Sequence, residues 1–337
     1  MNQSIYAGVD VGGTNTKVGI VAENGEVIQS GKFATLPESP PTNCLENAST
    51  FIRKLLNDAG IDYSDLKAFG LATPGPMDIA RGRVLTPFNL PGWRNVDVQN
   101  ILANVTDRPV AFSNDASAAA FGEYWVGSGK QYDSIVLITL GTGVGGGIIV
   151  NDFSIDGTHS HGSEIGHMLV DSKEDARLCS CGSKGHLEAY ASATGLVARC
   201  YEELGDGVQS TLQNQGDDNP ISALMIFQAA EAGDEFANRL VTQTANYLGD
   251  AIVSLVHIID PQAILLGGAM DFGGNESKTG KAFLKQIHDR ARPNCLPLLA
   301  EKLTIEFANL GSDAGFIGAA GLARQLHKST TPALPPA

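Results

Sequence analysis

The sequence predicts an α/β protein made of two related lobes with a cleft between them. A glycine turn between two strands occurs twice, at Gly12-Gly13 and at residues 141–147, and helical segments and further strands follow each turn. The length of 337 residues corresponds to about two domains. Apolar residues make up 43 % of the chain and charged residues 18 %, so each domain can bury a sizeable core.

Strands open the first half of the chain. The dipeptides Gly12-Gly13 and Asn24-Gly25 separate β-prone segments, and Asn-Gly is a strong signal for a two-residue hairpin turn. Residues 44–59 carry apolar side chains at helical spacing, and the rigid loop 73–76 ends an apolar segment. The expected strands of this half are residues 4–10, 16–22, 26–34 and 67–72.

The same order recurs in the second half. An apolar strand over residues 133–140 leads into the glycine turn 141–147, and the chain returns as a strand over 148–151. A long helix is expected over residues 235–259, followed by a strand over 263–266 that ends in Gly267-Gly268.

A final helix is expected over residues 314–326 and would pack back on the first lobe. We therefore expect a small lobe of residues 1–113, completed by a C-terminal helix over 313–327. Residues 114–312 would form the large lobe, and the proline-rich tail 328–337 would be frayed.

The charge balance argues against two classes of partner. Lys and Arg total 23 against 37 Asp and Glu, giving a net charge of −14, whereas nucleic-acid and anionic-membrane surfaces need a basic footprint. The N-terminus lacks the pattern of a signal peptide, and the apolar runs are interrupted by glycine or polar residues. We expect a soluble cytoplasmic protein in which Cys179 and Cys181, two of five cysteines, serve a metal site instead of a disulfide.

The first glycine turn has the composition of an anion-binding loop. In Asp10-Val-Gly12-Gly13-Thr14-Asn-Thr-Lys17, glycines let backbone amides approach phosphate oxygens closely. Thr14 adds a hydroxyl donor, Lys17 a cation, and Asp10 a carboxylate for Mg²⁺ or its waters. The alternative is an ordinary glycine hairpin.

The second turn, Gly141-Thr142-Gly143-Val-Gly-Gly-Gly, differs from known nucleotide fingerprints. It leads into a strand, whereas a dinucleotide-binding turn leads into a helix, and it lacks the Gly-Lys-Ser/Thr of a P-loop. Together with the first turn, it is typical of the other half of a phosphate clamp. Taken alone, it is equally typical of a flexible loop.

Asn114-Asp115 lies between an apolar stretch and a helix rich in small residues. A carboxylate there can cap the helix, or it can accept the proton of a substrate hydroxyl that attacks a phosphoryl group. Sequence spacing alone leaves both readings open.

Four side chains offer a possible N₂S₂ metal site: His167, Cys179, Cys181 and His186. Tetrahedral zinc suits this donor set, and four protein ligands would make the site structural. Unliganded cysteines beside surface histidines are the alternative. Glu164, His167 and Glu188 are polar groups that can bind a polyhydroxylated ligand, although each can equally be a surface residue.

Taken together, these motifs resemble the ROK family (repressors, open reading frames and sugar kinases) within the actin/Hsp70/hexokinase superfamily, over residues 6–322. The resemblance implies the actin-like, ribonuclease H-like fold. The motifs that carry it are Asp10-x-Gly-Gly-Thr14-x-x-Lys17, Thr73-Pro-Gly-Pro76, Asn114-Asp115-Ala-x-Ala-Ala-Ala-x-Gly-Glu123, Gly141-Thr-Gly-Val-Gly-Gly-Gly147, Glu164-Ile-Gly-His167, Cys179-x-Cys-Gly-x-x-Gly185-x-x-Glu188 and Leu266-Gly-Gly268.

The resemblance implies ATP-dependent phosphorylation of a hexose, with glucose as the first candidate. Asp115 would be the general base for the sugar's 6-hydroxyl group. His167 would bind zinc with one ring nitrogen and face the sugar with the other. The other hydroxyl groups would contact Gly75, Asn89, Asn114, Glu164, His167 and Glu188. ATP and Mg²⁺ would be held by Asp10, Gly12, Gly13, Thr14, Lys17, Gly141, Thr142, Gly143, Gly267 and Gly268.

The chain departs from the family pattern at His186, where the family usually has a third cysteine. Histidine is also a zinc ligand, so we expect the metal to be retained. N-acetylhexosamine, mannose and fructose are alternative substrates. A sugar-responsive repressor is the alternative of another class, but only nine residues precede Asp10, too few for a DNA-binding domain. The family resemblance also implies a homodimer or homotetramer.

Overall fold

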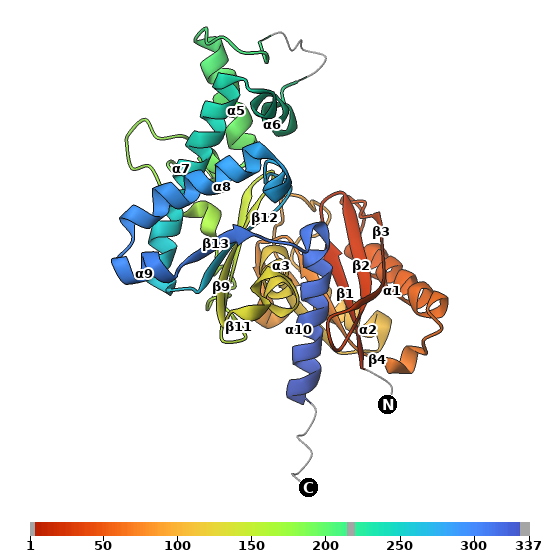
Figure 1. The fold of residues 1–337 in the computed structure, drawn as a ribbon. Coiled ribbons are helices and arrows are strands. Elements are labelled where there is room, and N and C mark those ends of the chain that lie inside the picture. Colours follow the sequence, from red (N-terminus) through yellow and green to blue (C-terminus); the bar gives the residue numbers. More distant parts are fainter. Residues whose placement is uncertain (1–3, 214–219, 331–337) are drawn as a thin grey trace. The chain divides into compact units, whose positions relative to one another are not determined.

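The computed structural model describes residues 4–213 and 220–330. They form two mixed five-stranded sheets, each with its own helices (Figure 1). The strand orders are β3-β2-β1-β4-β8 and β11-β10-β9-β12-β13, so each sheet has an antiparallel ribbon on one side and parallel strands on the other. The predicted α/β class with two related halves is confirmed.

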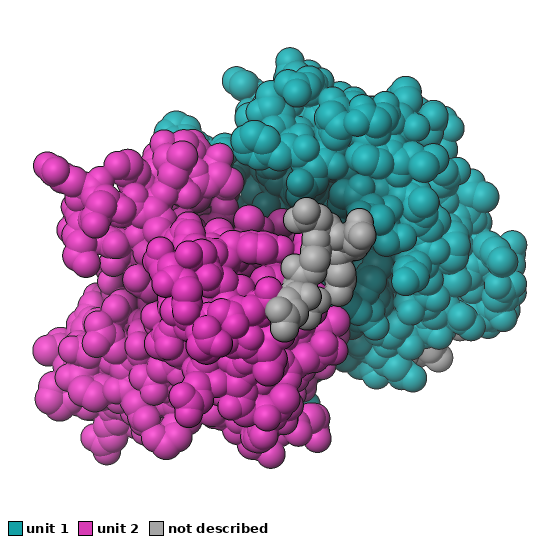
Figure 2. Space-filling view, turned by 90° about the horizontal axis from the view of Figure 1, so that it is seen from above, with its two compact units in different colours: residues 1–131, 147–163, 312–337 teal, residues 132–146, 164–311 magenta. Residues whose placement is uncertain are grey.

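Two compact units divide the chain, and Figure 2 shows them in different colours. The first unit contains residues 1–131, 147–163 and 312–337, and the second contains residues 132–146 and 164–311. Among the described residues, no helix is both long and apolar enough to cross a membrane. The lobe boundaries expected from the sequence, and the cleft, stay predictions.

The sheet of the first unit begins with the expected meander. The strands β1 (Ile5–Val11), β2 (Asn15–Ala22) and β3 (Val27–Ala34) pair antiparallel in chain order. The parallel strands β4 (Leu66–Thr73) and β8 (Val110–Asn114) extend the sheet on the side of β1. A separate small sheet contains β5 (Met77–Asp78), β6 (Arg83–Val84) and β7 (Val96–Asp97).

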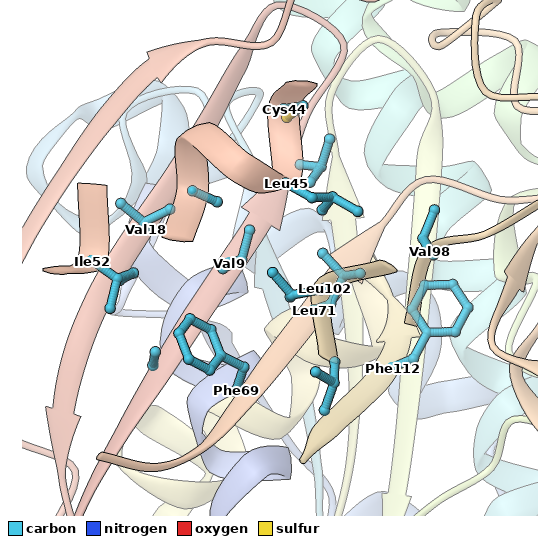
Figure 3. Packing of buried hydrophobic residues seen from close by; sticks show 14 of the residues in the cluster. Val9, Val18, Cys44, Leu45, Ile52, Phe69, Leu71, Val98, Leu102 and Phe112 are labelled. Carbon is cyan, nitrogen blue, oxygen red and sulfur yellow. The ribbon is translucent and has the colours of Figure 1, made fainter. Parts of the chain in front are cut away.

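Helices α1 (Pro41–Asp58) and α2 (Val98–Thr106) cover one face of this sheet. Proline occupies the first turn of α1, where its missing N–H costs no helical hydrogen bond, so the helix begins before the expected residue 44. Figure 3 shows part of the buried cluster, in which Val9 and Leu71 of the sheet lie with Ile52 of α1 and Leu102 of α2. The burial of these aliphatic side chains stabilises the unit.

Helices α3 (Asp115–Trp125) and α10 (Ala314–Thr330) pack together, and α10 covers the other face of the sheet. Glycines permit this close approach, because a methyl group on Gly8 of β1 would overlap the carbonyl oxygen of Phe316 in α10. Helix α10 continues to Thr330, so residues 328–330 of the expected frayed tail are helical. The rest of that tail, 331–337, lies outside the described residues.

The second sheet contains β9 (Ser134–Leu140), β10 (Val144–Val150), β11 (Phe153–Ser154), β12 (Ala263–Gly267) and β13 (Thr304–Phe307). Strand β10 begins at Val144 and not at the expected residue 148, so the glycine turn is only Gly141–Gly143. Gly147 lies within β10, and glycine is needed there because a side chain would overlap Ala120 of α3.

The helices of the second unit are α4 (Glu188–Ala191), α5 (Ala193–Gly205), α6 (Ala223–Ala232), α7 (Glu235–Ile259), α8 (Lys278–Ala291) and α9 (Pro297–Lys302). Helix α7 has the bounds expected from the sequence. The Asp234 side chain caps its start by accepting the Ala237 amide at 2.9 Å, and Asp260 ends it in the left-handed conformation with φ 52°.

Candidate active site and metal cluster

The expected site residues fall into two groups, one in each unit. The first unit holds Asp10, Gly12, Gly13, Thr14, Lys17, Gly75, Asn89, Asn114 and Asp115. The second unit holds Gly141, Thr142, Gly143, Glu164, His167, Cys179, Cys181, His186, Glu188, Gly267 and Gly268.

The first group gathers at the carboxyl ends of the parallel strands β1, β4 and β8. Asp10 lies near the end of β1, Gly75 follows β4, and Asn114 ends β8. A Cβ atom on Gly75 would meet the Asn114 side-chain nitrogen at 3.7 Å, and one on Gly13 would meet the Asn89 Cβ at 3.1 Å. The fold therefore brings these predicted residues together at one edge of the sheet.

Asp10 is an acid with an unusual environment. Its carboxylate lies against Gly315 in the first turn of α10, where a Cβ would overlap it. The pKa of Asp10 is raised to about 7: burial raises it most, the charge of Asp115 adds to the rise, and Lys17 opposes both. A divalent cation beside this carboxylate would favour its charged form, as the charges of metal ions do in general.

The Lys17 side chain binds the segment just before α10. Its ammonium group donates to the carbonyl oxygen of Ser312 and lies 3.3 Å from Asp313 Oδ1. No local pattern signals this contact, because Lys17 and Ser312 are 295 positions apart in the sequence. The lysine thus ties β2 to the start of α10.

The first glycine turn is fixed by a residue that sequence reasoning missed. The Thr35 hydroxyl donates to the Gly12 carbonyl at 2.8 Å, and the Thr35 amide donates to the Thr14 carbonyl at 3.0 Å. The Gly12 amide donates to the Asn15 carbonyl at 3.0 Å, so the turn is closed internally as well. These bonds give the turn a defined shape.

Asn114 caps α3, and Asp115 is the first residue of the helix. Asn114 Oδ1 accepts the amides of Ala116 at 2.9 Å and Ser117 at 3.4 Å. Asp115 Oδ1 also accepts the Ala116 amide, at 2.8 Å. Because Asn114 has the N-cap position, the alternative in which Asp115 caps the helix is wrong. Its carboxylate is half-buried at the positive end of α3.

The second glycine turn adjoins the Gly267-Gly268 turn. A Cβ on Gly268, which has φ 93°, would overlap the backbone of Leu140 just before Gly141. The Ala193 amide donates to the Gly141 carbonyl at 2.8 Å, and the Thr194 hydroxyl donates to the Thr142 carbonyl at 2.8 Å. The start of α5 therefore holds this turn against the ends of β9 and β12.

His167, Cys179, Cys181 and His186 form a cluster whose candidate ligand atoms all lie within 4.8 Å of one another. Within it, Cys181 Sγ lies 3.2 Å from His186 Nδ1, and Cys179 Sγ lies 3.9 Å from His167 Nδ1. Zinc bond lengths give tetrahedral edges of about 3.3–3.8 Å. Two sulfurs and two imidazole nitrogens at these spacings fit a zinc ion.

Tight turns make the cluster possible, and we call residues 179–186 the knuckle. The Gly182 amide donates to the Cys179 carbonyl at 2.9 Å, and the Cys179 amide donates to the Ser183 carbonyl at 2.8 Å. Gly182 has φ 90° and Gly185 has φ 79°, conformations that favour glycine. The knuckle thus brings both cysteines and His186 to one side.

Glu188, the first residue of α4, joins the knuckle to the second glycine turn. Its Oε2 accepts the Val144 amide at 3.1 Å, and its Oε1 accepts the Ser180 hydroxyl at 2.7 Å. Gly143 lies so close that a side chain there would overlap the Glu188 carboxylate. Glu164 precedes the short helical turn Ile165–His167 and is exposed, as is His167.

Comparison with known proteins shows the family. The ROK family model matches residues 6–326. A glucokinase of Halalkalibacterium halodurans is 36 % identical over 330 residues, covering 98 % of both chains, and an N-acetylmannosamine kinase of Haemophilus influenzae is 31 % identical, covering 93 % of both. The crystal structure of a ROK glucokinase from Streptomyces griseus in complex with glucose and AMPPNP aligns with a TM-score of 0.73 and 32 % identity, covering 96 % of this chain and 100 % of that one. The chain belongs to the ROK family, and it shares the actin-like fold of ROK kinases.

Proposed function

We propose that this protein transfers the terminal phosphoryl group of ATP to the 6-hydroxyl group of a hexose, and that the hexose is glucose. The observation that carries the proposal is the pair of acids at the carboxyl edge of the first sheet, Asp10 near the end of β1 and Asp115 directly after β8. Phosphoryl transfer needs one carboxylate for a divalent cation and another to accept the hydroxyl proton. The similarity to glucokinases over nearly the full chain supports glucose.

In this mechanism Asp115 takes the proton from the 6-hydroxyl group while that oxygen attacks the γ-phosphorus, and the bond to the leaving ADP breaks. Asp10 would hold Mg²⁺ or its waters, and the cation would neutralise charge on the phosphates. The first turn, with Gly12, Gly13 and Thr14, and the second turn, with residues 141–143 and Gly267-Gly268, would offer amides and hydroxyl groups to the phosphate oxygens. In the structure Lys17 instead fixes the start of α10.

The sugar's other hydroxyl groups would contact Gly75, Asn89, Asn114, Glu164, His167 and Glu188. His167, Cys179, Cys181 and His186 would bind a structural zinc ion, which fixes the orientation of the His167 ring. One ring nitrogen of His167 would then face the sugar.

An N-acetylmannosamine kinase is the second candidate, because such an enzyme is 31 % identical to this chain over 93 % of its length. The two substrates differ at C2, where a few side chains decide the preference. The family's dimers and tetramers make a homo-oligomer part of the proposal.

The test is ADP release with Mg-ATP across glucose, N-acetylglucosamine, N-acetylmannosamine, mannose and fructose. Glucose turnover that disappears in Asp115→Asn supports the proposal. Preferred turnover of N-acetylmannosamine would move the substrate to the second candidate. Folded, zinc-containing protein that turns over none of these sugars would contradict a hexose kinase.

A further inference from the structure

Ser180 lies between the two cysteines of the knuckle, and its closest polar partner is Glu188. Its hydroxyl donates to Glu188 Oε1 at 2.7 Å, whereas Cys179 Sγ is 3.9 Å away. A hydrogen bond to a carboxylate is short and about twice as strong as one between neutral groups. The serine therefore makes its shorter and stronger hydrogen bond to Glu188, and its contact with the sulfur of Cys179 is the longer one.

Glu188 carries this contact onward to the second glycine turn. Its Oε2 accepts the Val144 amide at 3.1 Å and its Oε1 accepts the Ser180 hydroxyl, so each oxygen has its own donor. Cys179 Sγ lies farther from Oε1, at 3.8 Å. A glutamate at a helix start has several accessible rotamers, and two donors fix one of them. The orientation of the carboxylate thus depends on a side chain whose own position is set by the knuckle.

We propose that Ser180 is a positioning residue, which holds the Glu188 carboxylate in the orientation that binds the sugar. The inference rests on the proposed function, in which Glu188 contacts a sugar hydroxyl group. It also explains how the metal cluster could influence sugar binding: Ser180 stands between Cys179 and Cys181, so the fold of the knuckle sets the position of Ser180 and, through it, of Glu188. Each Glu188 oxygen has a second lone pair, which can still accept a hydrogen bond from the sugar.

The experiment compares three variants with the wild-type protein: Ser180→Ala, Ser180→Thr and Ser172→Ala. Ser180→Thr keeps a hydroxyl group, and Ser172→Ala removes the hydroxyl of an exposed serine on the loop before the knuckle. Glucose affinity is measured by titration calorimetry without nucleotide, zinc content by elemental analysis, and kcat and KM by ADP release.

We expect Ser180→Ala to raise the glucose Kd and KM about 3- to 10-fold, the effect of one hydrogen bond to a partly exposed charged group. Its kcat, its KM for ATP and its zinc content should stay within about twofold of wild type, because Ser180 touches neither the phosphates nor the metal. Ser180→Thr should restore most of the affinity, and Ser172→Ala should match wild type.

Unchanged glucose affinity in Ser180→Ala would overturn the inference. Loss of zinc from that variant would overturn it as well, since the serine would then act by holding the knuckle together. Failure of the proposed function looks different: the wild-type protein itself would neither bind nor phosphorylate a hexose, and the inference would fall with it.

Discussion

The charge of Asp115 adds to the effect of burial in raising the pKa of Asp10, although 104 residues lie between the two acids in the sequence. Strands β1 and β8 run parallel in one sheet, with β4 between them, so both acids come to the same edge. Two like charges near each other cannot both ionise at low cost. A divalent cation held by Asp10 would offset this repulsion, which links the proposed Mg²⁺ role of Asp10 to the proposed base role of Asp115.

Replacing Asp115 with asparagine should abolish catalysis and spare the fold. The change keeps the size of the side chain and an oxygen that can accept the Ala116 amide, but it removes the proton acceptor. We expect kcat to fall at least about 10²-fold, the usual contribution of a general base. Glucose affinity, measured by calorimetry, should change much less. Turnover near the wild-type rate would show that another group takes the proton.

The raised pKa of Asp10 predicts a stability that depends on pH. The folded protein holds this proton up to about pH 7, whereas an aspartate in the unfolded chain releases it near its ordinary pKa of 3.8. The stabilisation from the shift is therefore fully present below pH 3.8 and is lost as the pH rises through 7. At pH 8 the buried charge costs the folded state free energy.

Asp10→Asn should consequently be more stable than wild type at pH 8, by about 1–4 kcal/mol, and the gain should shrink toward pH 5. Tryptophan fluorescence reports on the first unit, which contains Asp10, because the protein's two tryptophans, Trp93 and Trp125, both belong to that unit. Asp58→Asn, at an exposed position of α1, serves as the control. An Asp10→Asn gain of equal size at both pH values would contradict the raised pKa.

The sequence was a good guide wherever structure depends on local pattern. Helix α7 has its expected bounds because capping and apolar spacing are both local signals. The metal cluster was also readable, because three of its four residues lie within eight positions of one another. The sequence predicts that the glycines after Gly143 belong to the turn, and this prediction is wrong. Glycine is needed at position 147 because α3 packs against it, and α3 is a neighbour in space that the local sequence does not indicate.

Contacts between distant segments escaped sequence reasoning for the same reason. Thr35 holds the first glycine turn from the end of β3. Ser180 and Glu188 are closer in sequence, but their bond depends on how the knuckle folds. Neither residue type signals such a role, since serine and threonine are common in loops. The bond between Lys17 and Ser312 depends on α10 packing against the first sheet, which no local pattern specifies.

His186 should bind the metal in place of the family's usual cysteine. Its Nδ1 lies 3.2 Å from Cys181 Sγ, and removing it leaves three ligands. We expect His186→Ala to lower the zinc content of purified protein well below one equivalent, and His186→Cys to keep it, since both imidazole and thiolate bind zinc. Elemental analysis after dialysis against a weak chelator measures this. Full zinc occupancy in His186→Ala would show that the histidine is not a ligand.

A methyl group on Gly8 should destabilise the first unit. It would overlap the Phe316 carbonyl oxygen, which is backbone of α10 and cannot rotate away as a side chain can. We expect Gly8→Ala to lower the free energy of unfolding by about 2–3 kcal/mol, as overpacking in a close-packed core does.

Gly205→Ala is the control for Gly8→Ala. Gly205 is the last residue of α5, and nothing lies within 4 Å of a Cβ atom there. The control should be neutral or slightly stabilising. Denaturant titrations followed by tryptophan fluorescence measure Gly8→Ala, and circular dichroism follows Gly205→Ala in the unit without tryptophan. A Gly8→Ala protein as stable as wild type would mean that α10 does not lie as close to β1 as the structure has it.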